Sequence, residues 1–136
     1  MTQPHENPPV LGGPVPYLQV SDAAKAADFY VRALGATEVR RMPPDDKGRH
    51  MHIHLVVNGG SLMLADAFPE HGHPLETAGG FTLHLQVDDA DALFKRALAA
   101  GAEPLMPMTD MFWGDRYGQF RDPYGIRWSV GTTLKK

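Results

Sequence analysis

The sequence predicts an α+β fold made of two successive βαβββ modules. Three observations support this. Leu18–Ala23 reads LQVSDA and Leu85–Ala90 reads LQVDDA, an internal repeat with five identities in six positions. An apolar stripe at helical spacing follows each copy and stops at a glycine, Gly35 or Gly101. Each half then ends in two strand-like segments joined by a turn signal.

The first module is predicted at residues 14–66, after a loose N-terminal arm at residues 1–13. Prolines and glycines in the arm disfavour a helix and offer few strand donors. Ser21 or Asp22 can cap the first helix. Asn58-Gly59 predicts a two-residue hairpin turn, because both positions tolerate positive φ. The predicted strands are Pro16–Val20, Thr37–Met42, His50–Val57 and Gly60–Ala65.

A linker at residues 67–80, rich in proline and glycine, leads to the second module at residues 81–132. The two modules together form one domain. The segment Asp122–Gly125 reads DPYG and suits a type I turn between two strands. If the connection has four residues, it pairs Phe120 with Arg127 across the hairpin.

The composition excludes several classes of function. The chain has 136 residues, 21% of them charged, and a formal net charge of -3, so nothing points to nucleic acid or an anionic membrane as a partner. The absence of cysteine excludes disulfides, thiolate metal ligands and a cysteine nucleophile. No secretion signal or apolar run of about 20 residues is present. We expect a cytoplasmic protein whose partner is a small molecule or another protein.

Two groups of residues resemble those of a known superfamily. The chain is similar over about 14–132 to the vicinal oxygen chelate superfamily, which includes glyoxalase I, bleomycin resistance proteins and extradiol dioxygenases. The resemblance implies curved mixed sheets around a cavity, the glyoxalase/bleomycin resistance fold, and a homodimer. Its motifs are Asp28–Tyr30 with Leu34-Gly35, and Trp113–Arg116 with Asp122–Gly125 and Trp128. The second group is most similar to a glyoxalase-like branch labelled bleomycin resistance or demethylubiquinone-methyltransferase-like.

The resemblance also implies where a metal ion would bind. Metal-using members hold a divalent ion with His, Gln or Glu on the first and last strands of each module. Those positions fall here on Val15, Met63, Thr82 and Ser129, and none is a good ligand for such an ion. We therefore expect no metal and no cofactor.

Strand alternation predicts which side chains face the cavity. Inward histidines could hold a relocated divalent metal, although residues two apart on a strand lie about 7 Å apart. Arg116 and Arg127 could bind an acidic ligand, and the methionine-rich segment Leu105–Trp113 is either ordinary packing or a soft wall for a flat ligand. The expected ligand-binding residues are Tyr17, Gln19, His52, His54, Met63, His84, Met108, Trp113, Arg116, Phe120, Arg127 and Ser129.

Three functions are compatible with these residues. The leading hypothesis is a metal-independent homodimer that binds a small, partly aromatic molecule, as a sequestering or resistance protein. The alternative is a lyase, isomerase or dioxygenase with a metal on the inner histidines and Tyr17 or His84 as acid or base. The third is a protein-interaction module with a filled cavity. No Ser/His/Asp order or phosphate loop is visible.

Overall fold

The structure is a computed structural model that describes residues 8–135. The first seven residues of the predicted arm lie outside the described residues. The chain divides into two compact units, which we describe separately: residues 1–27 with 36–75, and residues 28–35 with 76–136. No helix within residues 8–135 is long and apolar enough to cross a membrane.

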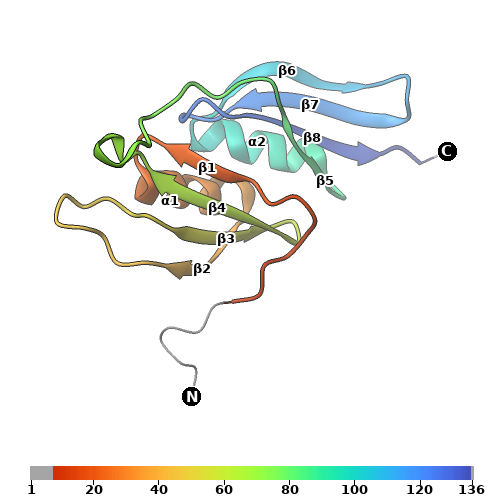
Figure 1. Cartoon of the computed structure of the whole chain (residues 1–136). Coiled ribbons are helices and arrows are strands. Elements are labelled where there is room, and N and C mark those ends of the chain that lie inside the picture. The colour runs from red at the N-terminus through yellow and green to blue at the C-terminus, as the bar shows by residue number, and fades with distance from the viewer. Residues whose placement is uncertain (1–7, 136) are drawn as a thin grey trace. The chain divides into compact units, whose positions relative to one another are not determined.

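The first unit contains a four-stranded sheet in the order β1-β4-β3-β2 (Figure 1). β1 runs parallel to β4, and the other neighbours are antiparallel. A short 3-10 helix, η1, lies within the predicted linker. The elements up to residue 75 are β1 (Tyr17–Val20), α1 (Ala23–Leu34), β2 (Thr37–Arg41), β3 (Ile53–Val57), β4 (Gly60–Asp66) and η1 (Pro69–His71). Of α1, residues 28–34 belong to the second unit.

The second unit repeats this arrangement with the strand order β5-β8-β7-β6. β5 is parallel to β8, whereas β8–β7 and β7–β6 are antiparallel. The predicted α+β architecture of two βαβββ repeats is therefore confirmed. The elements are β5 (Leu83–Gln86), α2 (Ala90–Ala100), β6 (Glu103–Asp110), β7 (Asp115–Arg121) and β8 (Arg127–Thr133).

The sequence signals at the helix ends are confirmed. Asp22 Oδ1 accepts a hydrogen bond from Lys25 N, and Asp89 Oδ1 accepts one from Ala92 N, each at 3.1 Å. These caps satisfy backbone donors that have no partner inside the helix. α2 is followed by Gly101, whose φ of 118° suits a residue without a side chain.

The first hairpin has the predicted register. Asn58 and Gly59 both have positive φ, 49° and 80°, so the turn contains two residues and pairs Val57 with Gly60. Alternation along β3 and β4 then places one set of side chains on the same face of the sheet, where they are buried. These are the buried apolar residues Ile53, Leu55, Val57, Leu62 and Leu64.

The second hairpin differs from the predicted register by one residue. Gly125 N donates to the Asp122 carbonyl oxygen at 3.1 Å, as in a type I turn, but Gly125 has a φ of 87°. Asp122 N also donates to the Ile126 carbonyl oxygen at 2.9 Å. A type I turn followed by a left-handed residue makes a three-residue connection. Phe120 consequently pairs with Trp128.

Asp122 organises the region around this turn. Its carboxylate accepts hydrogen bonds from Tyr124 N and Ile126 N at 2.8 and 3.0 Å, and from Trp128 Nε1 at 2.9 Å. The Tyr30 hydroxyl, on the part of α1 that belongs to this unit, donates to the same carboxylate. Asp122, the first residue of the DPYG segment, is thus a buried structural anchor.

Candidate functional site

Polar side chains gather on one face of the first sheet, in a row that crosses its four strands. The register sets Tyr17 beside Met63, Met63 beside His54, and His54 beside Arg40. Residues directly opposite one another in neighbouring strands present their side chains on the same face. The row therefore brings together Tyr17, His54 and Met63, as predicted, and adds Arg40.

Tyr17 and His52 form a hydrogen-bonded pair on this face. The Tyr17 hydroxyl lies 2.8 Å from His52 Nδ1 and donates to the Met51 carbonyl oxygen at 3.0 Å. While this hydroxyl donates to the carbonyl, it can accept a hydrogen bond from a protonated Nδ1. The pair fixes the orientation of the His52 ring.

His54 is nearly enclosed, with 1% of its surface exposed. Its Nε2 lies 2.7 Å from Ser61 Oγ, and this oxygen also accepts a hydrogen bond from Leu11 N at 2.8 Å. Ser61 N donates in turn to the Leu11 carbonyl oxygen at 3.0 Å. Part of the predicted arm is thus hydrogen-bonded to β4, while the arm's boundary at residue 13 stays a prediction.

A pocket of about 350 Å³ lies on this face. Its apolar wall includes two thioether side chains, and its polar wall contains two imidazoles and one guanidinium group. This combination is typical of small-molecule sites, which are mainly apolar with a few polar groups that orient the ligand. The lining residues are Pro8, Val10, Arg40, Met42, His52, His54 and Met63.

The two imidazoles of the pocket are harder to protonate than an ordinary histidine. Burial lowers the pKa of both His52 and His54, and the positive charge of Arg40 lowers both pKa values further. Burial also raises the pKa of the Tyr17 hydroxyl. At neutral pH these three side chains are uncharged, so they offer hydrogen bonds without adding charge to the pocket.

Gln19 lies at a second pocket on the same unit, of about 300 Å³. Its Nε2 donates to the His73 carbonyl oxygen at 3.1 Å. Tyr17 lines this pocket and is hydrogen-bonded to His52, which lines the first pocket, so this pair links the two pockets. The lining residues are Tyr17, Leu18, Gln19, Met51, Ala65, Asp66, Phe68 and His73.

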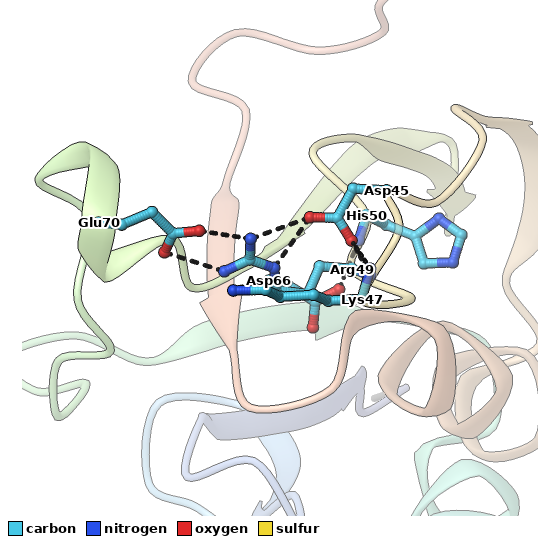
Figure 2. Close-up of polar contacts among 6 residues, drawn as sticks. All are labelled: Asp45, Lys47, Arg49, His50, Asp66 and Glu70. Atoms are coloured by element: carbon cyan, nitrogen blue, oxygen red, sulfur yellow. Dashed lines mark hydrogen bonds and ion pairs between the residues drawn. The ribbon is translucent and has the colours of Figure 1, made fainter.

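Arg49 holds the loop before β3 against the segment after β4 (Figure 2). Its guanidinium group forms ion pairs with Glu70 at 2.5 Å and Asp45 at 3.0 Å, and lies 4.4 Å from the centroid of the Phe68 ring. The hydrogen bonds from Arg49 lower the pKa of Glu70 to about 2. The loop is therefore fixed next to Phe68, a residue of the second pocket.

The predicted strand over His50–Val57 is wrong at its start, because β3 begins at Ile53. His50 N donates to the Asp66 carboxylate at 2.7 Å, and His50 Nδ1 donates to the Met42 carbonyl oxygen at 2.9 Å. These bonds hold His50 outside the alternation of β3. Met51, two residues before β3, is 61% exposed.

The side chains at the family's metal positions do not fit a divalent cation. In the first unit Val15 has no donor atom and Met63 has only a thioether. In the second unit Thr82 and Ser129 offer hydroxyl groups, and that of Ser129 is hydrogen-bonded to His84. Within residues 8–135, no group of three or more His, Cys, Asp or Glu side chains could hold a metal ion.

His84 is held at both ring nitrogens on the second sheet. Its Nδ1 lies 2.7 Å from Ser129 Oγ, and its Nε2 lies 2.7 Å from Gln86 Oε1. An amide oxygen only accepts hydrogen bonds, so in the neutral ring Nε2 carries the proton and Ser129 donates to Nδ1. The ring stacks on Tyr117, with centroids 5.8 Å apart and an interplanar angle of 19°.

Trp113 adjoins this face through Tyr117. The two rings meet edge to face with centroids 5.4 Å apart, and Trp113 Nε1 donates to Asp115 Oδ2 at 3.2 Å. The Phe112 ring lies 5.2 Å from Trp113 and is 96% exposed. Trp113 itself is half-exposed and lies beside the polar face of the second sheet.

Phe120 lies on the opposite face, so its predicted place toward the cavity is wrong. Its ring packs against Phe94 of α2, with centroids 6.3 Å apart. The three-residue turn pairs Phe120 with Trp128 and places Gln119 opposite Ser129. A register change of one residue moves a side chain to the other face of the sheet.

Arg116 and Met108 also lie on the helix-covered face, contrary to prediction. Arg116 forms ion pairs with Asp91 of α2 at 2.9 Å and with Asp110 at 3.0 Å. Met108 Sδ would lie 2.6 Å from a side-chain carbon added to Gly118. Met108 therefore fills the space that the glycine leaves.

Sequence reasoning missed several residues of the two polar faces. Arg40 and Met42 could have been found by continuing the alternation of the second strand. On the second sheet, the glycine at the end of DPYG was the available signal for a three-residue turn. That register gives the polar face Met106, Tyr117, Gln119 and Arg121, with Arg127 and Ser129 as predicted.

Comparison with known proteins identifies the family. The Glyoxalase/Bleomycin resistance protein/Dioxygenase superfamily matches residues 11–130. The chain belongs to this superfamily. The Mb0911c protein of Mycobacterium bovis is 44% identical to this superfamily member over 127 residues, which are 89% of this chain and 83% of the relative.

Two further relatives add to this comparison. The crystal structure of PA1353 from Pseudomonas aeruginosa has a TM-score of 0.75 and 34% identity, and the match covers 89% of this superfamily member and 97% of PA1353. The anthracycline biosynthesis protein DnrV of Streptomyces peucetius is 30% identical over 120 residues, 80% of this chain and 42% of DnrV. The family resemblance inferred from the sequence is confirmed.

Proposed function

We propose that the protein binds a small, partly aromatic molecule, without a metal ion, in the 350 Å³ pocket of the first unit. The observation that carries this proposal is the composition of the pocket wall. Met42, Met63 and Val10 offer apolar surface, while His52 and His54 offer uncharged hydrogen-bonding groups.

Thioether side chains suit a flat ligand because they are polarisable and adapt to irregular shapes. The imidazoles are held in place before a ligand arrives, His52 by Tyr17 and His54 by Ser61. Preorganised polar groups lose little conformational freedom on binding. A molecule with an aromatic ring and one hydroxyl or carbonyl group fits this arrangement.

Further residues support the same class of ligand. Gln19 and Tyr17 line the neighbouring pocket and could contact a larger molecule. On the second unit, taken by itself, His84, Ser129 and Trp113 are proposed to contact a ligand of the same class. One relative, DnrV, is named an anthracycline biosynthesis protein.

Metal independence is part of the proposal. The His52 and His54 rings are 6.3 Å apart between centroids, and among residues 8–135 no third histidine and no carboxylate side chain lines the pocket. Two imidazoles are fewer protein ligands than structural or catalytic zinc sites use. A lyase, isomerase or dioxygenase with a metal on these histidines is therefore the less favoured function.

Calorimetric titration with 2-naphthol tests the proposal on untagged protein treated with a chelator. We expect saturable binding that V10W abolishes, because Val10 is exposed and lines the pocket, so a larger side chain would fill it. V39W is the matched control, since Val39 is an exposed valine of β2 outside the pocket. It should bind like the native chain.

Elemental analysis of the same samples distinguishes the two functions. We expect no stoichiometric metal after chelation and no change in affinity when zinc, manganese or iron(II) is added. One metal ion per chain that disappears in H52A or H54A would contradict the proposal and support the enzyme.

A homodimer and a cytoplasmic location are the remaining parts of the proposal. Sedimentation at two protein concentrations would test the dimer, and a mass of one chain at both would contradict it. Fractionation of the native host would test the location.

A further inference from the structure

Two arginines face each other on the polar face of the second sheet. Arg121, the last residue of β7, pairs with Arg127, the first residue of β8. They lie on the same face as Gln119 and Ser129, opposite the face that carries Phe120. Directly opposed residues have Cβ atoms about 5 Å apart, and like charges in such a pair destabilise a sheet.

One of these arginines has an unsatisfied polar atom. Arg127 Nε is buried and has no hydrogen-bond partner among the residues the structure describes. Buried polar atoms are nearly always paired, because an unpaired one loses its hydrogen bond to water without replacement. The Arg116 guanidinium group, by contrast, forms ion pairs with two carboxylates.

Arg121 also has capacity for another partner. Its Nη1 makes a long hydrogen bond, 3.5 Å, to the Gly125 carbonyl oxygen. Across the sheet, the carboxylate in register with Arg121 is that of Glu103 on β6, and Glu103 is exposed. Glu103 is the internal competitor for any anion that approaches Arg121.

The neighbouring side chains define the rest of the ligand. One row further along the two strands lie Gln119 and Ser129, about 7 Å from the arginine row. The next aromatic group on this face is Tyr117, stacked on His84. An anion that also carries a planar ring can therefore pair with the arginines and lie over Gln119 toward Tyr117.

We propose that Arg121 and Arg127 form a binding site for the carboxylate group of an aromatic acid. A carboxylate accepts two parallel hydrogen bonds from a planar guanidinium group. It would neutralise the opposed charges of the two guanidinium groups. This site belongs to the second unit and is separate from the pocket of the proposed function, so either can exist without the other.

Titration with benzoate tests this site on the full-length protein, monitored by backbone amide NMR at constant ionic strength. We expect benzoate to shift the amide signals of Gln119, Arg121 and Arg127. Benzamide, which has the same shape without the charge, should bind about tenfold more weakly or worse. Equal affinity for benzoate and benzamide would overturn the proposal.

Three variants and one control variant connect the binding to these residues. R127Q and R121Q should each weaken benzoate binding about tenfold, whereas E103Q should strengthen it by removing the competing carboxylate. K95Q removes a positive charge from an exposed position on α2 and should bind like the native chain. If K95Q loses as much affinity as R127Q, only net charge matters and the site does not exist.

The pocket-filling variant V10W separates this site from the proposed function. It should abolish 2-naphthol binding and leave benzoate binding unchanged. Loss of benzoate binding in V10W, with R127Q unaffected, would assign the acid to the first unit and overturn the site proposed here.

Discussion

A histidine meets a serine on each sheet at the same distance, 2.7 Å, but at different positions of the repeat. On the first sheet His54 of β3 pairs with Ser61 of β4, and the ring lies in a pocket beside Arg40. On the second sheet His84 of β5 pairs with Ser129 of β8, and its other nitrogen is bonded to Gln86.

This difference shows that one scaffold supports two kinds of polar face. The first sheet places imidazoles among apolar side chains, where a ligand can replace solvent. The second sheet bonds its histidine at both nitrogens and instead leaves unsatisfied hydrogen-bonding capacity at Arg127. The repeat therefore preserves the backbone pattern, while each unit has its own site chemistry.

The largest expected difference between the two units concerns their buried aspartates, Asp122 and Asp66. D122A removes the acceptor of four hydrogen bonds, from two backbone amides, Tyr30 and Trp128. D66A removes those from Ala23 N and His50 N. We expect a loss of unfolding free energy of about 4 kcal/mol or more for D122A and about 2 kcal/mol for D66A.

Urea denaturation of both variants measures these losses. Y30F is the milder companion of D122A, since it removes one of the four donors and keeps the ring. An equal loss in D122A and D66A would show that the second turn is not the stronger anchor.

The next largest expected effect concerns Gly118 of the second sheet. It occupies the position of Ile53 in the first sheet, since Ile53 pairs with Leu64 and Gly118 pairs with Val130. A methyl group on Gly118 would meet Met108 Sδ at 2.6 Å and the Met106 carbonyl oxygen at 3.2 Å.

We expect G118A to lower the unfolding free energy by about 2 kcal/mol through overpacking. M108A should recover part of this loss when combined with it, because the thioether is the nearer obstacle. A double-mutant cycle by urea denaturation checks the coupling. Strict additivity of the two losses of unfolding free energy would show that Met108 does not contact residue 118.

The pocket histidines predict a pH effect confined to the first unit. Burial and Arg40 lower the pKa of His52 in the folded chain, so the unfolded chain binds more protons as the pH falls past about 6.5. The resulting stabilisation is present above that pH and is lost as the pH falls through the folded pKa.

Comparison of urea midpoints at about pH 7.5 and about pH 5.5 tests this sign. H52Q should lose less stability on acidification than the native chain. H71Q changes an exposed histidine outside both pocket walls and should behave like the native chain. A fall in H52Q as steep as in the native chain would contradict the assignment.

The smallest expected effect concerns Arg49. Its ion pairs with Glu70 and Asp45 are partly exposed, and such pairs contribute little to stability. R49Q should therefore leave the unfolding midpoint almost unchanged but speed amide hydrogen exchange in residues 43–52. Native exchange rates in that loop would show that Arg49 does not fix it.

Much of the fold follows from local sequence signals. The repeat at Leu18 and Leu85, the helix caps and Asn58-Gly59 each predict backbone geometry within a few residues, where local sterics decide. The first polar face was predictable because a two-residue turn fixes the register. Tyr17, His54 and Met63 therefore lie as expected.

The second polar face was less predictable, for a physical reason. DPYG fits both a three- and a four-residue connection, and the choice depends on whether Gly125 adopts positive φ. A register change of one residue places Gln119, and not Phe120, on the polar face. β6 contains bulges that place Met106, and not Met108, on the polar face. No comparable local signal in the sequence predicts these bulges.

Histidine side-chain NMR of chelator-treated protein during a 2-naphthol titration tests whether the pocket of the first sheet binds its ligand without a metal ion. We predict that the imidazole signals of His52 and His54 shift with one affinity, remain in the neutral form at about pH 7, and respond identically when a divalent metal is added. Shifts that require the metal, or shifts at His84 without any at His52 and His54, would contradict metal-free binding in the pocket of the first sheet.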